Sequence, residues 1–147
     1  MSEVNKIIVY IDGGSRGNPG PAALGVAIEG IGKGRTYNSF LGTLTNNEAE
    51  YQALLFSLKK VKSLIGKDEL KNQSIDIRSD SELLINQVEG RFKIEEPRLQ
   101  KLFIEFWNIK IDFPNLSFKL IPREQNRTAD RLVNNALDKE TSTLPGF

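Results

Sequence analysis

The residues from Val4 to Ile11 (VNKIIVYI) form a nearly continuous run of mostly β-branched side chains. This pattern predicts a buried strand, which other elements of the fold must cover. The run stops at a carboxylate, Asp12, and a loop rich in glycine and proline follows it (GGSRGNPGP). The aspartate therefore either starts a turn or belongs to a functional site.

Strand and helix patterns alternate after this first run. Apolar runs bounded by turn residues predict strands at residues 23–29, 35–44, 74–79 and 116–122. Helical periodicity with start and stop signals predicts helices at residues 45–66, 80–90, 96–112 and 126–140. We expect Asn46 or Asn47 to cap the first helix. Strands linked through helices run parallel, so the first, fourth and fifth should be parallel, with an antiparallel hairpin at one edge. The predicted fold class is α/β.

The chain has 147 residues, which suits one domain with a full-sized core. We expect a single catalytic domain over residues 1–140 and a flexible tail at residues 141–147. No apolar run approaches membrane-spanning length and the first residues lack a signal-peptide pattern, which favours a soluble cytoplasmic protein. The simplest expectation is a monomer with no protein partner and no membrane association.

The sequence contains no histidine and no cysteine. Their absence excludes thiol chemistry and removes both the usual general base and the commonest metal ligand. Catalysis would then depend on carboxylates, hydroxyls, lysine or arginine, or on a hard metal ion held by oxygen atoms. The net charge of +1 neither supports nor excludes nucleic-acid binding, which would need a local basic patch.

Two acidic residues lie on helix faces that are otherwise apolar. Glu50 precedes Leu54 by one turn on the apolar stripe of the first helix. The positive end of that helix favours an ionised carboxylate there. Asp130 shares a face of the last helix with Val133. Both acids are expected to point toward the sheet.

Two more acids, Asp12 and Asp80, directly follow predicted parallel strands. Binding sites in such sheets form at the carboxyl ends of the parallel strands. Four acids gathered there would repel one another, so a shared cation is the economical explanation. All-oxygen ligands favour Mg²⁺ or Mn²⁺ over Zn²⁺. Two such ions, roughly 4 Å apart, suit an in-line displacement at phosphorus.

Each acid also has a purely structural alternative. Asp12 can be a turn residue, and Asp80 can cap the helix that follows it. Glu50 can be an ordinary first-turn helix charge, and Asp130 can lie at the edge of a solvated face. Spacing alone does not show that the four side chains meet.

Four segments, in this order, resemble the ribonuclease H type 1 family, whose members cleave the RNA strand of RNA–DNA hybrids. They are IDGGSRGNPGPAALGVAI, TNNEAEYQAL, SDSELLINQ and REQNRTADRLVNNAL, and the resemblance covers roughly residues 4–140. It implies a ribonuclease H-like fold: a five-stranded mixed sheet in the order 3-2-1-4-5, with strand 2 antiparallel, flanked by helices.

The resemblance also implies an endonuclease that uses two Mg²⁺ or Mn²⁺ ions and leaves 5′-phosphate and 3′-hydroxyl ends. The implied catalytic and metal-binding carboxylates are Asp12, Glu50, Asp80 and Asp130, with Gly13 as a further metal contact. The implied substrate contacts are Gly13, Gly14, Asn18, Thr45, Asn46, Gln52 and Asn126. Asparagine and glutamine suit this role because they can both donate to and accept from 2′-hydroxyls in a shallow minor groove.

The chain departs from the family pattern in two places. Many members carry a loop histidine before the final helix, whereas this segment reads IPREQNRTAD, and neither Arg123 nor Glu124 can be assigned that role. Some members also have a basic extra helix, and only RFKIEEPR stands at that point here. The helical spacing of Phe103, Phe106 and Trp107 predicts that all three pack in the core.

Two other functions stay open at this stage. One is another nuclease with the same fold, such as a junction resolvase or an exonuclease. The second is a non-catalytic domain that binds hybrids or RNA. Loss of one acid would favour the binding domain, and all four acids are present.

Overall fold

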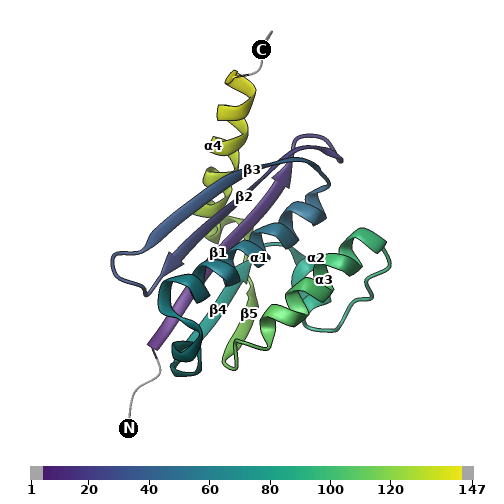
Figure 1. Ribbon diagram of the computed structural model, residues 1–147. Coiled ribbons are helices and arrows are strands. Elements are labelled where there is room, and N and C mark those ends of the chain that lie inside the picture. The colour runs from purple at the N-terminus through teal and green to yellow at the C-terminus, as the bar shows by residue number, and fades with distance from the viewer. Residues whose placement is uncertain (1–4, 144–147) are drawn as a thin grey trace.

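The computed structural model describes residues 5–143, which form a five-stranded mixed sheet with helices on both faces (Figure 1). The strands are β1 (Asn5–Ser15), β2 (Gly20–Glu29), β3 (Arg35–Leu44), β4 (Gln73–Ser79) and β5 (Leu116–Leu120). Their spatial order is β3-β2-β1-β4-β5. β4 runs parallel to β1 and to β5, whereas β2 is antiparallel to both of its neighbours. The predicted fold class, strand order and antiparallel second strand are confirmed.

The helices divide between the two faces of this sheet. They are α1 (Asn46–Ile65), α2 (Glu82–Val88), α3 (Pro97–Lys110), α4 (Arg127–Thr143), and the short 3-10 helices η1 (Lys67–Asn72) and η2 (Arg123–Gln125). α1 packs on β1 with α3 beside it, and α4 packs on β2 and β3. Residues 141–143 of the predicted tail belong to α4, and residues 144–147 lie outside the described part of the chain. Within residues 5–143, no helix has both the length and the apolar character needed to cross a membrane.

The first strand continues through Asp12 instead of ending at Ile11. Its parallel pairing with β4 stops at Tyr10, opposite Arg78. Its antiparallel pairing with β2 goes on to Ser15. Asp12 therefore lies inside a strand yet beyond the end of the parallel ladder. The alternative that Asp12 is a turn residue is wrong, and so is the expectation that a loop begins directly after it.

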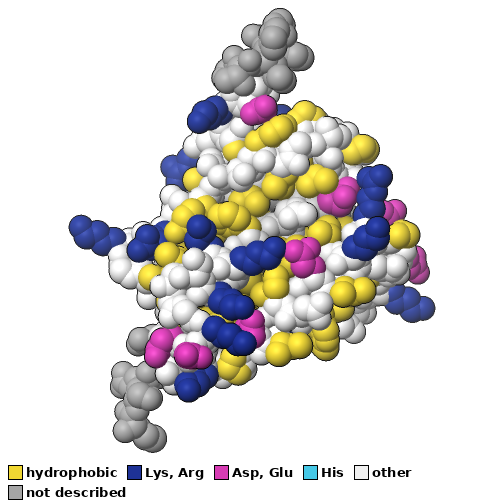
Figure 2. Space-filling model, in the orientation of Figure 1, with side chains coloured by type: hydrophobic (Ala, Val, Ile, Leu, Met, Phe, Trp, Pro, Cys, Tyr) yellow, Lys and Arg dark blue, Asp and Glu magenta, His cyan; other side chains and the backbone are white. Residues whose placement is uncertain are grey.

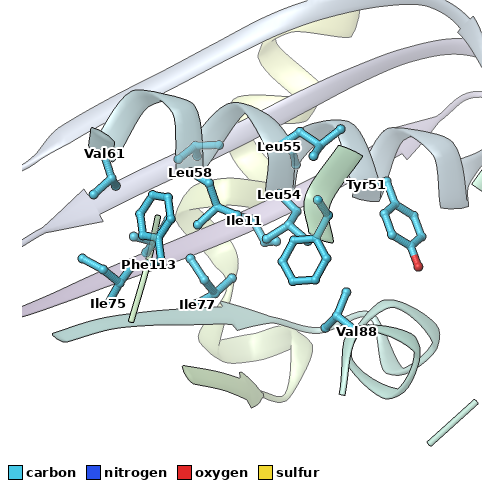
Figure 3. Packing of buried hydrophobic residues seen from close by; sticks show 14 of the residues in the cluster. Ile11, Tyr51, Leu54, Leu55, Leu58, Val61, Ile75, Ile77, Val88 and Phe113 are labelled. Atoms are coloured by element: carbon cyan, nitrogen blue, oxygen red, sulfur yellow. The ribbon is translucent and has the colours of Figure 1, made fainter. Parts of the chain in front are cut away.

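The main core lies between α1 and the centre of the sheet. Ile11 of β1 and Ile77 of β4 face Leu54 and Leu58 of α1, and all four are fully buried (Figure 3). Complete burial of one such side chain contributes about 1.5–3 kcal/mol to stability. The predicted apolar stripe of the first helix is therefore its core face, and Glu50 lies on the same stripe.

Only part of the aromatic run in α3 belongs to the core. Phe106 is fully buried, and Phe103 packs against the core from a partly buried position. Trp107 is 51% exposed and stacks on Phe103 with ring centroids 5.9 Å apart. The prediction of core packing is thus correct for Phe106 and wrong for Trp107.

The start of α4 lies directly on β2 because residue 25 is a glycine. A Cβ on Gly25 would stand 2.3 Å from the carbonyl oxygen of Ala129. Any side chain there would push the helix off the sheet. Farther along the same helix, Val133 and Leu137 pack with Ala23 in a second, smaller cluster. This contact sets the height at which Asp130 stands above β1 and β2.

Candidate metal centre and nucleic-acid interface

Carboxylates from separate elements meet at one end of the sheet, in a cleft of about 920 Å³. One oxygen from each of Asp12, Glu50 and Asp80 lies within 4.8 Å of the other two. Asp130 lines the same cleft, is within hydrogen-bonding reach of Asp12, and adds its charge to theirs. The four acids singled out in the sequence therefore occupy one cleft, with three of them in a tighter group.

Gly13 is the residue that lets α1 approach β1 closely enough to form this group. A Cβ on Gly13 would lie 2.2 Å from the carbonyl carbon of Ala49 and 2.5 Å from the nitrogen of Glu50. Gly14 is under no such constraint, because its Cβ would make an ordinary 3.5 Å contact with Val133. A glycine is thus needed at position 13 because the helix and the strand are in contact there. This contact places Glu50 beside Asp12.

Asp80 follows β4 and does not cap the next helix. The capping residue of α2 is Ser81, whose side chain accepts from the backbone N–H of Leu84 at 3.2 Å. The Ser79 hydroxyl accepts from the backbone N–H of Ser81 at 3.0 Å and holds the chain as it leaves the strand. With capping assigned to Ser81, the Asp80 carboxylate is free to point into the cleft.

Glu50 and Glu48 are both only 8% exposed, but they do different things. Glu48 closes a capping box at the start of α1. Its carboxylate accepts from the backbone N–H of Thr45 at 3.1 Å, and the Thr45 hydroxyl accepts from the backbone N–H of Glu48 at 3.2 Å. Glu50 belongs to the carboxylate group, and its buried Oε2 has no hydrogen-bond partner within residues 5–143. Thr45, and not Asn46 or Asn47, is therefore the cap of α1.

Burial and clustering raise the pKa values of three carboxylates, Asp12, Glu50 and Asp80. The pKa of Asp12 is raised to about 7, first by burial and then by the charges of Asp80 and Asp130. Burial, followed by the charges of Asp12 and Asp80, raises the pKa of Glu50 well above its ordinary value. The pKa of Asp80 is also raised by burial, while the nearby Arg123 guanidinium acts in the opposite direction. Charges in such a group are costly unless a counter-charge is supplied.

The donor set fits a hard divalent cation. Every candidate ligand is a carboxylate oxygen, the type that Mg²⁺ and Mn²⁺ prefer. The unpartnered Oε2 of Glu50 is a buried acceptor that a cation would satisfy. A bound cation would also offset the repulsion that raises the pKa values of Asp12 and Glu50. The group therefore has both the chemistry and the electrostatic need for a metal.

Two asparagines beside the cleft have their amide groups oriented by the protein itself. The Oδ1 of Asn46 accepts from the backbone N–H of Ser15 at 2.8 Å, and the Oδ1 of Asn18 accepts from the backbone N–H of Asn46 at 3.1 Å. Both acceptor ends are thus used internally, and neither Nδ2 donates to any described residue. The two side chains present N–H donors, which suit the oxygen atoms of a sugar-phosphate backbone.

The other implied substrate contacts lie in more varied places. Gly13, Gly14 and Asn46 line the carboxylate cleft, whereas Gln52 and Asn126 do not. Asn126 is 1% exposed and donates to the carbonyl of Ile11 at 2.8 Å. It supports the cleft from behind instead of facing a substrate. Its hydrogen bond to Asp80 helps to keep that carboxylate ionised.

Two arginines also line the cleft, although the sequence patterns did not assign them to it. Arg16 is held by Asp138 at 2.5 Å, which ties the β1–β2 connection to α4. The guanidinium of Arg123 forms no ion pair or hydrogen bond with the described residues. Arg123 could have been assigned to the cleft from its position directly after the last predicted strand, because β5 ends beside β4. Basic side chains are otherwise spread among acids on the face shown in Figure 2.

A mixed sheet in this order, with carboxylates gathered at the ends of β1 and β4, defines the ribonuclease H-like class of fold. The model of the reverse transcriptase-like family matches residues 10–136. The chain is 43% identical to LC11-RNase H1, whose structure in complex with an RNA/DNA hybrid has a TM-score of 0.84 and covers 92% of this chain and 99% of that one. RNase H1 from Halobacterium salinarum is 35% identical, with a TM-score of 0.80 over 91% of this chain and 98% of its own.

The chain belongs to the ribonuclease H type 1 family. Among curated proteins it is 35% identical to a bifunctional protein of Mycobacterium tuberculosis over 90% of its own length. It spans only 36% of that relative. It is also 37% identical to ribonuclease HI of Halobacterium salinarum, of which it spans 65%.

Proposed function

We propose that this protein is an endonuclease that hydrolyses the RNA strand of RNA–DNA hybrids and leaves 5′-phosphate and 3′-hydroxyl ends. The observation that carries the proposal is the group formed by Asp12, Glu50 and Asp80 beside the donors of Asn46. A relative at 43% identity has been solved with an RNA/DNA hybrid, which supports the same substrate here.

The residues of the cleft divide the work of this reaction. Asp12, Glu50, Asp80 and Asp130 would hold two Mg²⁺ or Mn²⁺ ions. When bound, such ions supply activation of a water and stabilisation of the leaving 3′ oxygen. Asn18 and Asn46 would direct N–H donors at the RNA strand, where the 2′-hydroxyl distinguishes RNA from DNA. Because the chain has no histidine, proton transfer would pass through water and carboxylates.

Cleavage of a hybrid with a labelled RNA strand tests the proposal. The reaction is run with Mg²⁺, with Mn²⁺ and with EDTA, and duplex DNA, duplex RNA and single-stranded RNA serve as comparison substrates. We expect metal-dependent cuts within the RNA strand of the hybrid. The comparison substrates should be cut much more slowly or not at all. The Asp12→Asn variant should bind the hybrid but not cut it. A silent wild-type protein, or a variant that cuts equally well, would contradict the proposal.

The same experiment separates the two alternative functions. A non-catalytic binding domain would retain the hybrid without cutting it under any metal condition. A nuclease of different specificity would cut duplex DNA at least as fast as the hybrid. The intact carboxylate group favours catalysis over binding alone, because four clustered acids repel nucleic acid unless a cation is bound.

A further inference from the structure

A second cleft, of about 460 Å³, lies on the α4 side of the sheet. Its floor comes from β1 and β2, one wall from the β2–β3 turn and the start of β3, and the other wall from η2 and the first residues of α4. The residues that line it are Tyr10, Ala27, Ile28, Glu29, Lys33, Gly34, Arg35, Thr36, Glu124, Gln125, Asn126, Arg127 and Thr128. Its volume falls within the range of small-molecule sites.

The second cleft exists because α4 begins where it does. The helix touches the sheet at Gly25, and its chain enters from η2 beside Asn126. Toward the other end of β2, the next residue on the same face is Ala27, which lies between Tyr10 and Thr36 in the cross-strand register. The small alanine leaves a hollow flanked by two hydroxyl-bearing residues. Asn126 separates this hollow from the carboxylate cleft.

Three cations surround the second cleft, and none of them has a partner among the residues that the structure describes. Lys33, Arg35 and Arg127 form no ion pair or side-chain hydrogen bond with any residue between 5 and 143. Two acids, Glu29 and Glu124, also line the cleft and are likewise unpaired within that range. The cations outnumber the acids, so the cleft carries a net positive charge.

The first turn of α4 adds unsatisfied donors to this wall. The first helical hydrogen bond of α4 is made by the N–H of Asp130. The backbone N–H groups of Arg127 and Thr128 find no acceptor in the described chain. Asn126, which is 1% exposed, occupies the N-cap position of α4. Its buried Oδ1 has no hydrogen-bond partner among the described residues, so it does not cap these N–H groups. Free N–H groups at a helix start, together with unpaired cations, favour an anion.

We propose that the second cleft binds the phosphate of a nucleotide. Arg35, Arg127 and the exposed start of α4 would contact the phosphate oxygens, since charge-assisted hydrogen bonds are the stronger kind. Glu29 and Glu124 would accept from the hydroxyl or amino groups of the sugar and base. This mixture of cations and acids fits a nucleotide better than a bare inorganic anion. The site is distinct from the carboxylate cleft and requires no cleavage activity.

The test is a titration monitored through the backbone amide resonances of the ¹⁵N-labelled protein in metal-free buffer with EDTA. Without a metal, the acidic cleft repels phosphate, and the resonances of residues that line only the second cleft report binding there separately from any contact at Asn18 and Asn46. The probes are inorganic phosphate, adenosine 5′-monophosphate and adenosine. A short RNA is added with and without a 5′-phosphate, which distinguishes a free nucleotide from the end of a strand.

We expect saturable shifts at Gly34, Arg127 and Thr128 with the monophosphate, weaker shifts with inorganic phosphate, and none with adenosine. The double variant Arg35→Gln/Arg127→Gln should weaken binding at least about tenfold, since two charged contacts are lost. A matched variant that removes two exposed lysines elsewhere, Lys71→Gln/Lys101→Gln, should bind like wild type.

Three results would overturn the proposal. The first is that the wild-type protein shows no saturable shift. The second is that adenosine binds as well as its monophosphate, and the third is that both double variants lose binding equally. The wild-type titration decides the matter even if the double variant folds poorly. Hybrid cleavage is recorded separately, so failure of this proposal leaves the proposed endonuclease activity untouched, and the converse also holds.

Discussion

Gly13 of β1 and Ala49 of α1 lie so close together that a Cβ on the glycine would stand 2.2 Å from the carbonyl carbon of the alanine. Because the obstacle is backbone, neither side can move away as a flexible side chain would. Gly13 directly follows Asp12 in the chain, and Ala49 directly precedes Glu50, so each is the neighbour of one acid of the carboxylate group. The distance between strand and helix at this point therefore fixes the distance between two acids.

The Gly13→Ala variant should lose both stability and metal binding. The added methyl group must push α1 away from β1, and overpacking of this kind costs about 1–3 kcal/mol. Urea denaturation measures the stability loss, and hybrid cleavage measures the effect on the site. Gly14→Ala is the matched control, because its Cβ would meet Val133 at an ordinary 3.5 Å. Equal effects of the two substitutions would show that the close approach at Gly13 does not matter.

The Asp12→Asn variant should be more stable than wild type in metal-free buffer at pH 8. The pKa of Asp12 in the folded protein is about 7, above its ordinary 3.8. The folded state therefore keeps a proton that the unfolded chain releases, and wild-type stability falls as pH rises from about 4 to about 7. Asparagine carries no charge and avoids this loss, which is on the order of 4 kcal/mol.

Urea denaturation of both proteins at pH 8 and pH 5, with EDTA present, measures this difference. At pH 5 Asp12 is mostly protonated, so the advantage of the variant should shrink. Excess Mg²⁺ should reverse it at pH 8, because the cation stabilises only the protein that can bind it. A variant less stable than wild type at pH 8 without metal would contradict the clustering of ionised acids.

Much of this site could be predicted from the sequence because its acids stand at positions that physical rules make unusual. Glu50 and Asp130 interrupt apolar helix faces, and Asp12 and Asp80 directly follow the apolar runs of two parallel strands. The continuation of β1 past Asp12 could not be predicted, since the glycines and proline after it are typical of a loop. Tertiary pairing with β2 keeps this segment extended.

Other features depended on contacts that no local pattern encodes. Thr45 and Asn46 are both good capping residues, and the reciprocal bond with Glu48 decides for Thr45. Helical spacing places Trp107 near the apolar face of α3 but cannot say where that face ends. The second cleft arises from the height of α4 above β2, which a single glycine sets.

The Asn46→Asp variant should weaken recognition of the RNA strand without unfolding the protein. Aspartate keeps an oxygen to accept from the Ser15 N–H and suits the first turn of α1, but it removes the outward N–H donor. We expect the KM for a hybrid to rise at least about tenfold. Hybrids with single 2′-deoxy substitutions in the RNA should then discriminate less in the variant than in wild type. Unchanged discrimination would mean that Asn46 does not contact a 2′-hydroxyl.

The Arg123→Gln variant should shift the acidic limb of the pH–rate profile to higher pH. The Arg123 guanidinium opposes the rise in the pKa of Asp80, so its removal lets that pKa rise further. More acid-sensitive cleavage is therefore expected, measured as kcat/KM against pH at constant ionic strength. Lys119→Gln, which removes an exposed cation from the neighbouring strand, is the control. Identical profiles for both variants and wild type would exclude an electrostatic role for Arg123.

A matched pair of glutamates on one helix tests the central claim most directly. Glu50 and Glu48 are equally buried, but only Glu50 belongs to the carboxylate group. Hybrid cleavage is measured in Mg²⁺ and in Mn²⁺ for Glu50→Gln and Glu48→Gln. We predict that Glu50→Gln reduces kcat at least about a hundredfold and that Glu48→Gln, which can still close the capping box, stays near wild type. Equal activity of the two variants would contradict a metal-dependent carboxylate centre at this end of the sheet.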